Sequence, residues 1–303
     1  MKKSRSEYFV ALALVFFMVC IAVAFLYGFL TGTDKVEAKY KTLLAERSDP
    51  LNQTGAYDQA SLSSYYHLAY LPYEDFRKVW FENTNTLETA DSGKETSSLV
   101  QEIRKQATSS FDRIHEGTMP EHSPLLVDAH NHLLKSMKLF DQELAKFEAD
   151  AKTLDGSKLA AALNKSAGLK EAMRFALQAQ EEYFAAILQW NNKAPDGTKN
   201  AELLKEKDLS LKNWELLKLN QKNMYLARTA TEAPLFSNYA PQDLTAQIDA
   251  LIATGQRDKL KLKSVQDAVD VLLATDAVRE GDFSRLKAKR YPNETMPLIP
   301  FFN

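Results

Sequence analysis

The stretch from Leu126 to Leu154, LVDAHNHLLKSMKLFDQELAKFEADAKTL, contains the most regular pattern in the chain. Its seam positions alternate spacings of four and three residues: Leu126, His130, Leu133, Met137, Phe140, Leu144, Phe147, Ala151 and Leu154. This spacing places the side chains on one face of an α-helix, in a seam typical of helices that pack as in a coiled coil. Lysine, aspartate and glutamate occupy the other faces. The pattern therefore predicts a long amphipathic helix whose apolar stripe is buried.

More helices are predicted on both sides of this seam. Ser123 and Pro124 form a typical helix start, with serine as the N-cap and proline in the first turn. Asp155 and Gly156 break the helix at its other end. Apolar residues recur at helical spacing in further segments, which are residues 97–116, 157–192, 201–229, 241–254, 264–279 and a short basic helix after Gly281. Pro72 is expected to divide the aromatic-rich segment 58–83 into two short helices.

Glycine and proline, ten of each among 303 residues, are too few for the many turns of a β-sandwich or barrel. No segment shows the alternation of a strand, and no repeat period emerges. Helices joined by short Asp-Gly and Pro-Asp-Gly turns pack as antiparallel neighbours. We therefore predict an all-α fold, with an elongated antiparallel helical bundle over residues 58–291 and a proline-containing C-terminal tail over residues 292–303.

The N-terminal segment is strongly apolar. From Tyr8 to Leu30 there are 23 residues without a charge, a length that spans roughly 34 Å as a helix and can cross a bilayer. A cleaved signal peptide has a shorter apolar core of about 7–15 residues and a small-residue cleavage site, so we expect an uncleaved anchor. The predicted organisation is a short cytoplasmic tail over residues 1–7, a transmembrane helix over residues 8–30, and a membrane-proximal helix and linker over residues 31–57.

The charges before the apolar run predict its orientation. Lys2, Lys3 and Arg5 form a compact basic cluster before the span. Basic residues are no rarer after the span, so the prediction depends on this clustering rather than on a count. We expect a single-pass protein of the bacterial cytoplasmic (inner) membrane, with the N-terminus inside and the main domain extracytoplasmic. The lipid bilayer is then a partner of residues 8–30.

Four small residues form a stripe along the predicted span and its exit. Cys20, Ala24, Gly28 and Gly32 recur every four residues, so they lie on one face of a helix. Small residues at this spacing let two transmembrane helices approach closely, which predicts self-association or packing against a partner helix. The alternative is that Gly28 and Gly32 only loosen the end of the helix.

Charge and cysteine content exclude several classes of function. The chain has 38 Lys and Arg against 40 Asp and Glu, a net charge of −2, so no basic excess attracts nucleic acid. Its single cysteine, Cys20, leaves the rest of the chain without a disulfide, a thiolate metal site or a cysteine nucleophile. Motifs for a serine nucleophile, a phosphate-binding loop, a zinc protease and haem attachment do not occur. We therefore expect a non-enzymatic protein without a cofactor.

Four of the five histidines fall between His115 and His132. A chain reversal could bring His115, His122 and His130 together as a metal site. Against this, no Glu-x-x-His pair occurs, and His130 and His132 are two residues apart, so on a helix they face nearly opposite directions. We expect His115 to favour the carbonyl end of its helix, His122 to lie in a loop and His130 in the core, with no bound metal.

The C-terminal sequence PLIPFF is apolar and contains Pro297, Pro300, Phe301 and Phe302. The segment between its two prolines can adopt polyproline II conformation, in which it could dock on a partner protein. It could equally fold back and cover the chain's own bundle. The composition slightly favours this second arrangement.

These observations leave three hypotheses for function. The first is a non-enzymatic scaffold or regulatory subunit of a membrane or envelope complex, which binds an envelope protein or a second copy of itself. The second is a ligand-sensing helical module with a pocket between helices. The third is a metal-dependent enzyme that uses the cluster from His115 to His132. A protruding apolar groove or patch would favour the first, and a buried pocket with convergent polar groups would favour the second.

Overall fold

The computed structural model describes residues 56–91, 93–119, 121–194 and 197–302. Regular structure in this part of the chain is helical, with one isolated bridge between Ser210 and Ser264. The all-α prediction is therefore confirmed for the described residues. The predicted anchor over residues 8–30, with the stripe from Cys20 to Gly32, lies outside them. Among the helices within the described ranges, none combines the length and apolar character that a membrane crossing requires.

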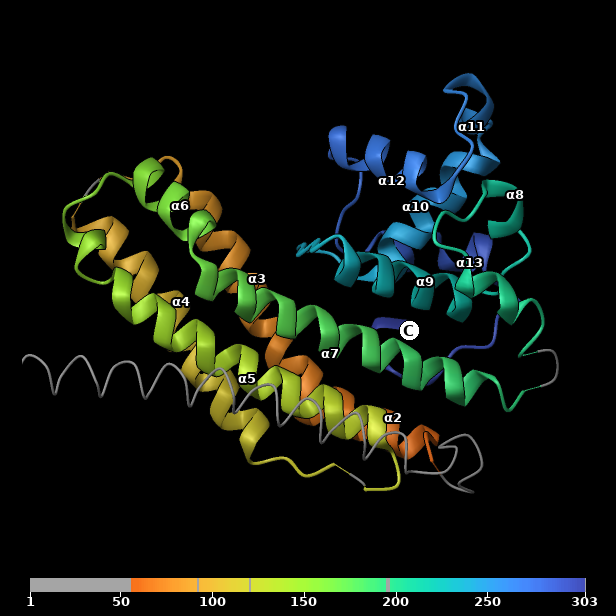
Figure 1. Ribbon diagram of the computed structural model, residues 1–303, viewed down its shortest axis with the longest axis horizontal. Coiled ribbons are helices and arrows are strands. Elements are labelled where there is room, and N and C mark those ends of the chain that lie inside the picture. The colour runs from red at the N-terminus through yellow and green to blue at the C-terminus, as the bar shows by residue number, and fades with distance from the viewer. Residues whose placement is uncertain (1–55, 92, 120, 195–196, 303) are drawn as a thin grey trace, which may run out of the picture. The chain divides into compact units, whose positions relative to one another are not determined.

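A first group of long helices forms an antiparallel bundle (Figure 1). It consists of α3 (Leu71–Leu87), α4 (Lys94–His115), α5 (Pro124–Phe147) and α7 (Ala167–Asn191), with the shorter α6 (Gly156–Lys165) between α5 and α7. Hydrogen bonds between α4 and α5 show the relative direction of these two helices. Near one end, the ring of His130 bonds the carbonyl of Ile114, and toward the other, Arg104 bonds Asp141. Helices α4 and α5 therefore run in opposite directions, as their short connection predicts.

The seam of α5 packs inside this bundle. The buried side chains of the helix are Leu126, Ala129, Leu133, Ser136, Met137, Phe140 and Leu144. The ring of Phe140 lies 4.6 Å from that of Phe76 and 5.0 Å from that of Trp80, centroid to centroid. The predicted stripe thus meets apolar faces of its own chain. Helix α5 ends at Phe147, and the buried Ala151 follows in a separate 3-10 turn, so the helix is shorter than the pattern predicts.

The prediction that Pro72 separates two helices is wrong. Helix α2 (Gln59–Tyr65) passes into the π-helix η2 (Tyr66–Tyr70) and then directly into α3. In the wider π-turn, the N–H of Leu71 donates to the carbonyl of Tyr66, five residues earlier. Pro72 then lies in the first turn of α3, where its missing N–H is tolerated. Helix α3 also continues to Leu87, past the end of the predicted segment at residue 83.

The prediction of one helix over residues 201–229 is also wrong. This segment forms the 3-10 helix η4 (Ala201–Lys205), the short α8 (Leu211–Trp214) and α9 (Leu219–Glu232). Backbone groups between these short helices form hydrogen bonds with a distant segment, residues 263–265, instead of continuing one helix. The N–H of Leu211 donates to the carbonyl of Lys263, and the N–H of Val265 donates to the carbonyl of Leu209. These bonds hold residues 209–211 in extended form next to the start of α12.

A second group of helices comprises α8, α9, α10 (Pro241–Ala253), α11 (Gln256–Lys259), α12 (Val265–Ala274) and α13 (Asp282–Arg290). Parts of α8, α9, α10 and α12 surround a second apolar core, whereas α13 packs on α10 and its Phe283 belongs to the core of the first bundle. Trp214, Ile248 and Val269 are among the buried residues of the second core. Ser264 caps α12 by accepting from the N–H of Asp267, and Pro241 opens α10, as their sequence predicts. Helix α9 packs on α7, so the two groups belong to one compact unit.

The packing of Phe140 gives a test of the core. Phe140→Ala should destabilise the protein by about 3–5 kcal/mol, because the ring is fully buried against Phe76 and Trp80. Thermal unfolding of the full-length chain should show a clear fall in melting temperature. Gln142→Ala, on the exposed face of α5, is the matched control and should change little. A melting temperature that rises with protein concentration would instead place the seam between two chains.

Candidate functional site

The structure does not bring the candidate histidines together as a metal site. The ring Nε2 of His130 lies 2.8 Å from the carbonyl oxygen of Ile114 at the end of α4. His115 is the last residue of α4 and stacks on Phe111, and His122 lies in the exposed loop before α5. Within the described ranges, no group of three or more His, Cys, Asp or Glu side chains is placed to hold a metal ion.

The C-terminal tail is folded back on the chain's own bundle. Ile299 and Phe302 are fully buried, as is Pro297, while Pro300 is exposed. The ring of Phe301 lies among aromatic rings of the first bundle, those of Tyr66, Tyr70, Tyr183 and Phe184.

The side-chain amide of Gln59 fixes the tail at Leu298. It accepts from the N–H of Leu298 and donates to the carbonyl of the same residue, at 2.9 and 3.0 Å. Pro297, Phe301 and Phe302 therefore contact this chain in the arrangement that the composition slightly favoured, rather than standing free for a partner.

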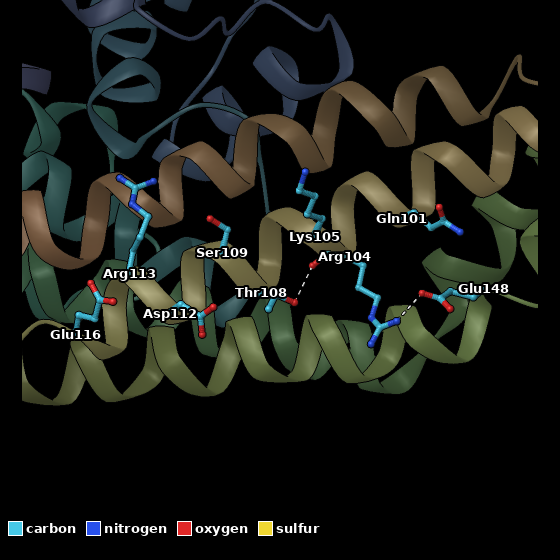
Figure 2. Close-up of a pocket in the computed structure, with 9 residues that line it drawn as sticks. All are labelled: Gln101, Arg104, Lys105, Thr108, Ser109, Asp112, Arg113, Glu116 and Glu148. Atoms are coloured by element: carbon cyan, nitrogen blue, oxygen red, sulfur yellow. Dashed lines mark hydrogen bonds and ion pairs between the residues drawn. The ribbon is translucent and has the colours of Figure 1, made fainter.

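An open groove of about 520 Å³ runs along α4 (Figure 2). Its lining residues are Gln101, Arg104, Lys105, Thr108, Ser109, Asp112, Arg113, Glu116 and Glu148. Most of these side chains project from one face of α4, and none of them is buried. Arg104 pairs with Asp141 and Glu148, and Arg113 pairs with Asp75. We call this surface the α4 groove. It is a solvated face of mixed charge.

A smaller cavity of about 140 Å³ has a buried charge at its floor. Its lining residues are Glu74, Arg77, Lys78, Phe81, Glu82, Asn85, Asn238 and Glu280. Arg77 is only 4% exposed, and Glu74 and Phe81 are partly buried, while the remaining residues form an exposed rim. We call this the Arg77 cavity. Its floor comes from α3, and its far rim comes from the segments that precede α10 and α13.

Arg77 is held by three parts of the chain. Its Nη2 donates to Glu74 on the same helix at 2.8 Å. Its Nη1 donates to the carbonyl of Tyr239 and to the side chain of Gln180 on α7, at 3.4 and 3.5 Å. Nη2 also lies 2.8 Å from the other oxygen of the Glu74 carboxylate, so the short contacts are to Glu74, whereas those to Tyr239 and Gln180 are long for a guanidinium that offers five N–H donors in a rigid fork. The floor of the cavity therefore carries a fixed positive charge that could form stronger bonds with a further acceptor.

Buried acidic groups surround Arg77. Burial raises the pKa of Glu74, an effect that the charge of Arg77 opposes and that of Glu280 increases. Burial also raises the pKa of Asp243 to about 6. The carboxylate of Asp243 accepts from the N–H groups of Ala240 and Phe283, at 3.1 and 3.0 Å, and so joins the starts of α10 and α13. Titratable groups that burial perturbs beside a cavity are typical of functional sites.

This site was not predicted from the sequence, although one signal of it is present there. Tyr73, Arg77 and Trp80 are spaced by four and three residues, which puts Arg77 on the buried face of α3. A charged residue in an apolar stripe needs a partner inside the protein. No such signal marks Asn238 or Glu280, which reach the cavity from loops far along the chain.

The pKa of Asp243 predicts a specific pH dependence of stability. Its pKa in the folded protein, about 6, lies above the ordinary value of 3.8, so folding favours the protonated form. This stabilisation is complete below pH 3.8 and is lost as the pH rises through 6, a total of roughly 3 kcal/mol. Relative to Asp243→Asn, which stays neutral, the wild-type protein should lose stability between pH 4 and pH 7. Denaturant unfolding at several pH values measures this difference, and a constant difference would disprove the assignment.

Comparisons with known proteins return no similarity to this chain. No family model, no curated protein and no solved structure matches it. Its function is therefore inferred from its own side chains. Within the described residues, the Arg77 cavity is where buried charge, perturbed titratable groups and open space coincide.

Proposed function

We propose that this chain is a membrane-anchored, non-enzymatic sensing protein whose helical domain binds a small polar ligand in the Arg77 cavity. The observation that carries the proposal is the buried Arg77 side chain at the floor of a cavity with polar groups around it. The sequence alone placed a scaffold first and a ligand-sensing module second. A buried pocket with convergent polar groups was the feature that would favour sensing; the Arg77 cavity has the convergent polar groups, but its rim is exposed and only its floor is buried.

The position of the cavity supports a sensing role. Arg77 and Glu74 lie on α3 of the first bundle, whereas Asn238 and Glu280 precede α10 and α13 of the second group. A ligand that contacts both sets of residues favours the conformation in which the two groups of helices meet closely. Ligand binding would then change the relative stability of conformations, which is the physical basis of a sensor.

The membrane part of the proposal rests on the N-terminal sequence. The uncharged run from Tyr8 to Leu30 supports an anchor, and Lys2, Lys3 and Arg5 support an N-terminus inside a bacterial cytoplasmic membrane. A membrane or envelope protein partner would carry the signal onward.

A second candidate is a scaffold or regulatory subunit that binds a partner through the α4 groove, whose lining residues are polar or charged rather than apolar. The volume of the groove, about 520 Å³, is larger than that of the Arg77 cavity, and the groove is open along the length of a helix (Figure 2). Arg104 and Arg113 have partners within this chain, whereas Lys105, Asp112 and Glu116 are exposed to solvent. A protein of complementary charge could bind such a surface.

The orientation of the proposed anchor is testable in intact cells. Protease added to spheroplasts should digest the domain that follows residue 31, because the basic cluster of Lys2, Lys3 and Arg5 should keep the N-terminus inside. Immunoblotting of the fragments measures the digestion. A cytoplasmic protein serves as the control for lysis. Protection of the domain until the cells are lysed would reverse the orientation and remove the extracytoplasmic role.

The ligand-binding role is testable with a screen of small polar molecules. Full-length protein in mild detergent should show a raised melting temperature with at least one of them, since binding to the folded state stabilises it. Glu280→Gln and Asn238→Ala, on the exposed rim of the cavity, should reduce the effect without unfolding the protein. Glu88→Gln, an exposed change at the end of α3 outside the cavity, should not. A ligand that stabilises all variants equally would bind elsewhere.

A further inference from the structure

The charges of the Arg77 cavity narrow the chemistry of its ligand. We infer that it binds a small zwitterion, with a carboxylate and a protonated amine on the same or adjacent carbon atoms, as in an α-amino acid. The inference rests on the proposed ligand-binding function and goes one step further, to a class of molecule. Three features of the cavity support it: the buried guanidinium, the acidic rim and the small volume.

The guanidinium of Arg77 selects the carboxylate end. It lines the cavity, is 4% exposed, and its short contacts are both to the carboxylate of Glu74. A ligand carboxylate in the cavity would accept charge-assisted bonds from the guanidinium in the planar geometry that arginine favours. Buried charged groups gain most from such pairing, because competing water is excluded.

The acidic residues select a cationic group at the other end. Glu74, Glu82 and Glu280 line the cavity against Arg77 and Lys78, so the lining carries one net negative charge. A dianion or a phosphate would meet this excess negative charge. A protonated amine between the glutamates would instead relieve their mutual repulsion, which already acts between Glu74 and Glu280. The amide side chain of Asn238 lies at the same rim and can accept from the amine.

The small volume of the cavity favours a small ligand. A space of about 140 Å³ corresponds to roughly five water molecules, well below the roughly 300–1,000 Å³ of pockets for drug-sized ligands. A small amino acid fits this space. Phe81 provides one apolar wall, and its ring is held by stacking on Phe236 at 5.4 Å. That wall suits a methyl or short aliphatic side chain.

The test compares ligands that carry both charges with ligands that carry one. Calorimetric titration of full-length protein in detergent at pH 7 uses glycine and alanine, with acetate and methylamine as the single-charge probes. The amino acids should bind at least about tenfold more tightly than either probe, a difference of about 1.4 kcal/mol. Glu280→Gln should weaken the binding of glycine and methylamine and should not weaken that of acetate. Arg77→Lys should weaken glycine and acetate, and Glu88→Gln should change none of them.

The possible results separate the inference from the proposed function. If acetate or methylamine binds as tightly as glycine, the inference of a zwitterionic ligand is overturned, and a site for some other polar ligand remains. If Glu280→Gln does not change the affinity for glycine, the amine binds elsewhere, and the inference is again overturned. If the amino acids do not bind but another screened molecule does, in a manner sensitive to Glu280→Gln, the inference fails and the sensing function stands. If no small molecule binds, both fail. Glu280 is exposed, so these outcomes do not depend on a variant that fails to fold.

Discussion

The burial of one positive charge constrains how the described helices fit together. The guanidinium of Arg77 is almost fully removed from water, and a buried charge is tolerated only when it is paired and hydrogen-bonded. Its partners come from α3, from α7 and from the carbonyl of Tyr239, which immediately precedes α10. Leaving one member of such a pair alone typically costs about 3–5 kcal/mol. The contact between the first bundle and the second group of helices therefore has a fixed point, and the cavity lies beside it.

Features that depend on neighbouring residues could be predicted from the sequence. The seam of α5, with Phe140 at its centre, follows from a spacing that any buried helix must satisfy. Ser264 caps α12, and Asp155 caps α6 by accepting from the N–H of Lys158, each within three residues of the group it satisfies. The all-helical character and most helix starts follow from such local rules, and the low glycine and proline content agrees with them.

Features that depend on distant residues could not be predicted in this way. The segment 201–229 has helical spacing, but the bonds of Leu209 and Leu211 to residues beyond 260 outcompete a continuous helix. A proline such as Pro72 normally ends a helix. Here a π-turn precedes it, so that Pro72 lies in the first turn of α3, where its missing N–H is tolerated. The candidate site depends most strongly on distant residues. Arg77 could be recognised as a charge on an apolar helix face, whereas Glu280, which lines the same cavity, follows it by about two hundred residues. The exposed histidines, which are conspicuous in the sequence, are not part of it.

The burial of the tail has a consequence for the order in which the protein is made. Ile299 and Phe302 complete the core, and Phe301 covers the rings of Tyr66 and Tyr70. Of all the described residues, these leave the ribosome last. Until then the aromatic surface of the first bundle stays uncovered, through synthesis and through any export across a membrane. This is the interval in which aggregation competes with folding, so a chaperone that shields aromatic surface would act on this chain before residues 299–302 are made.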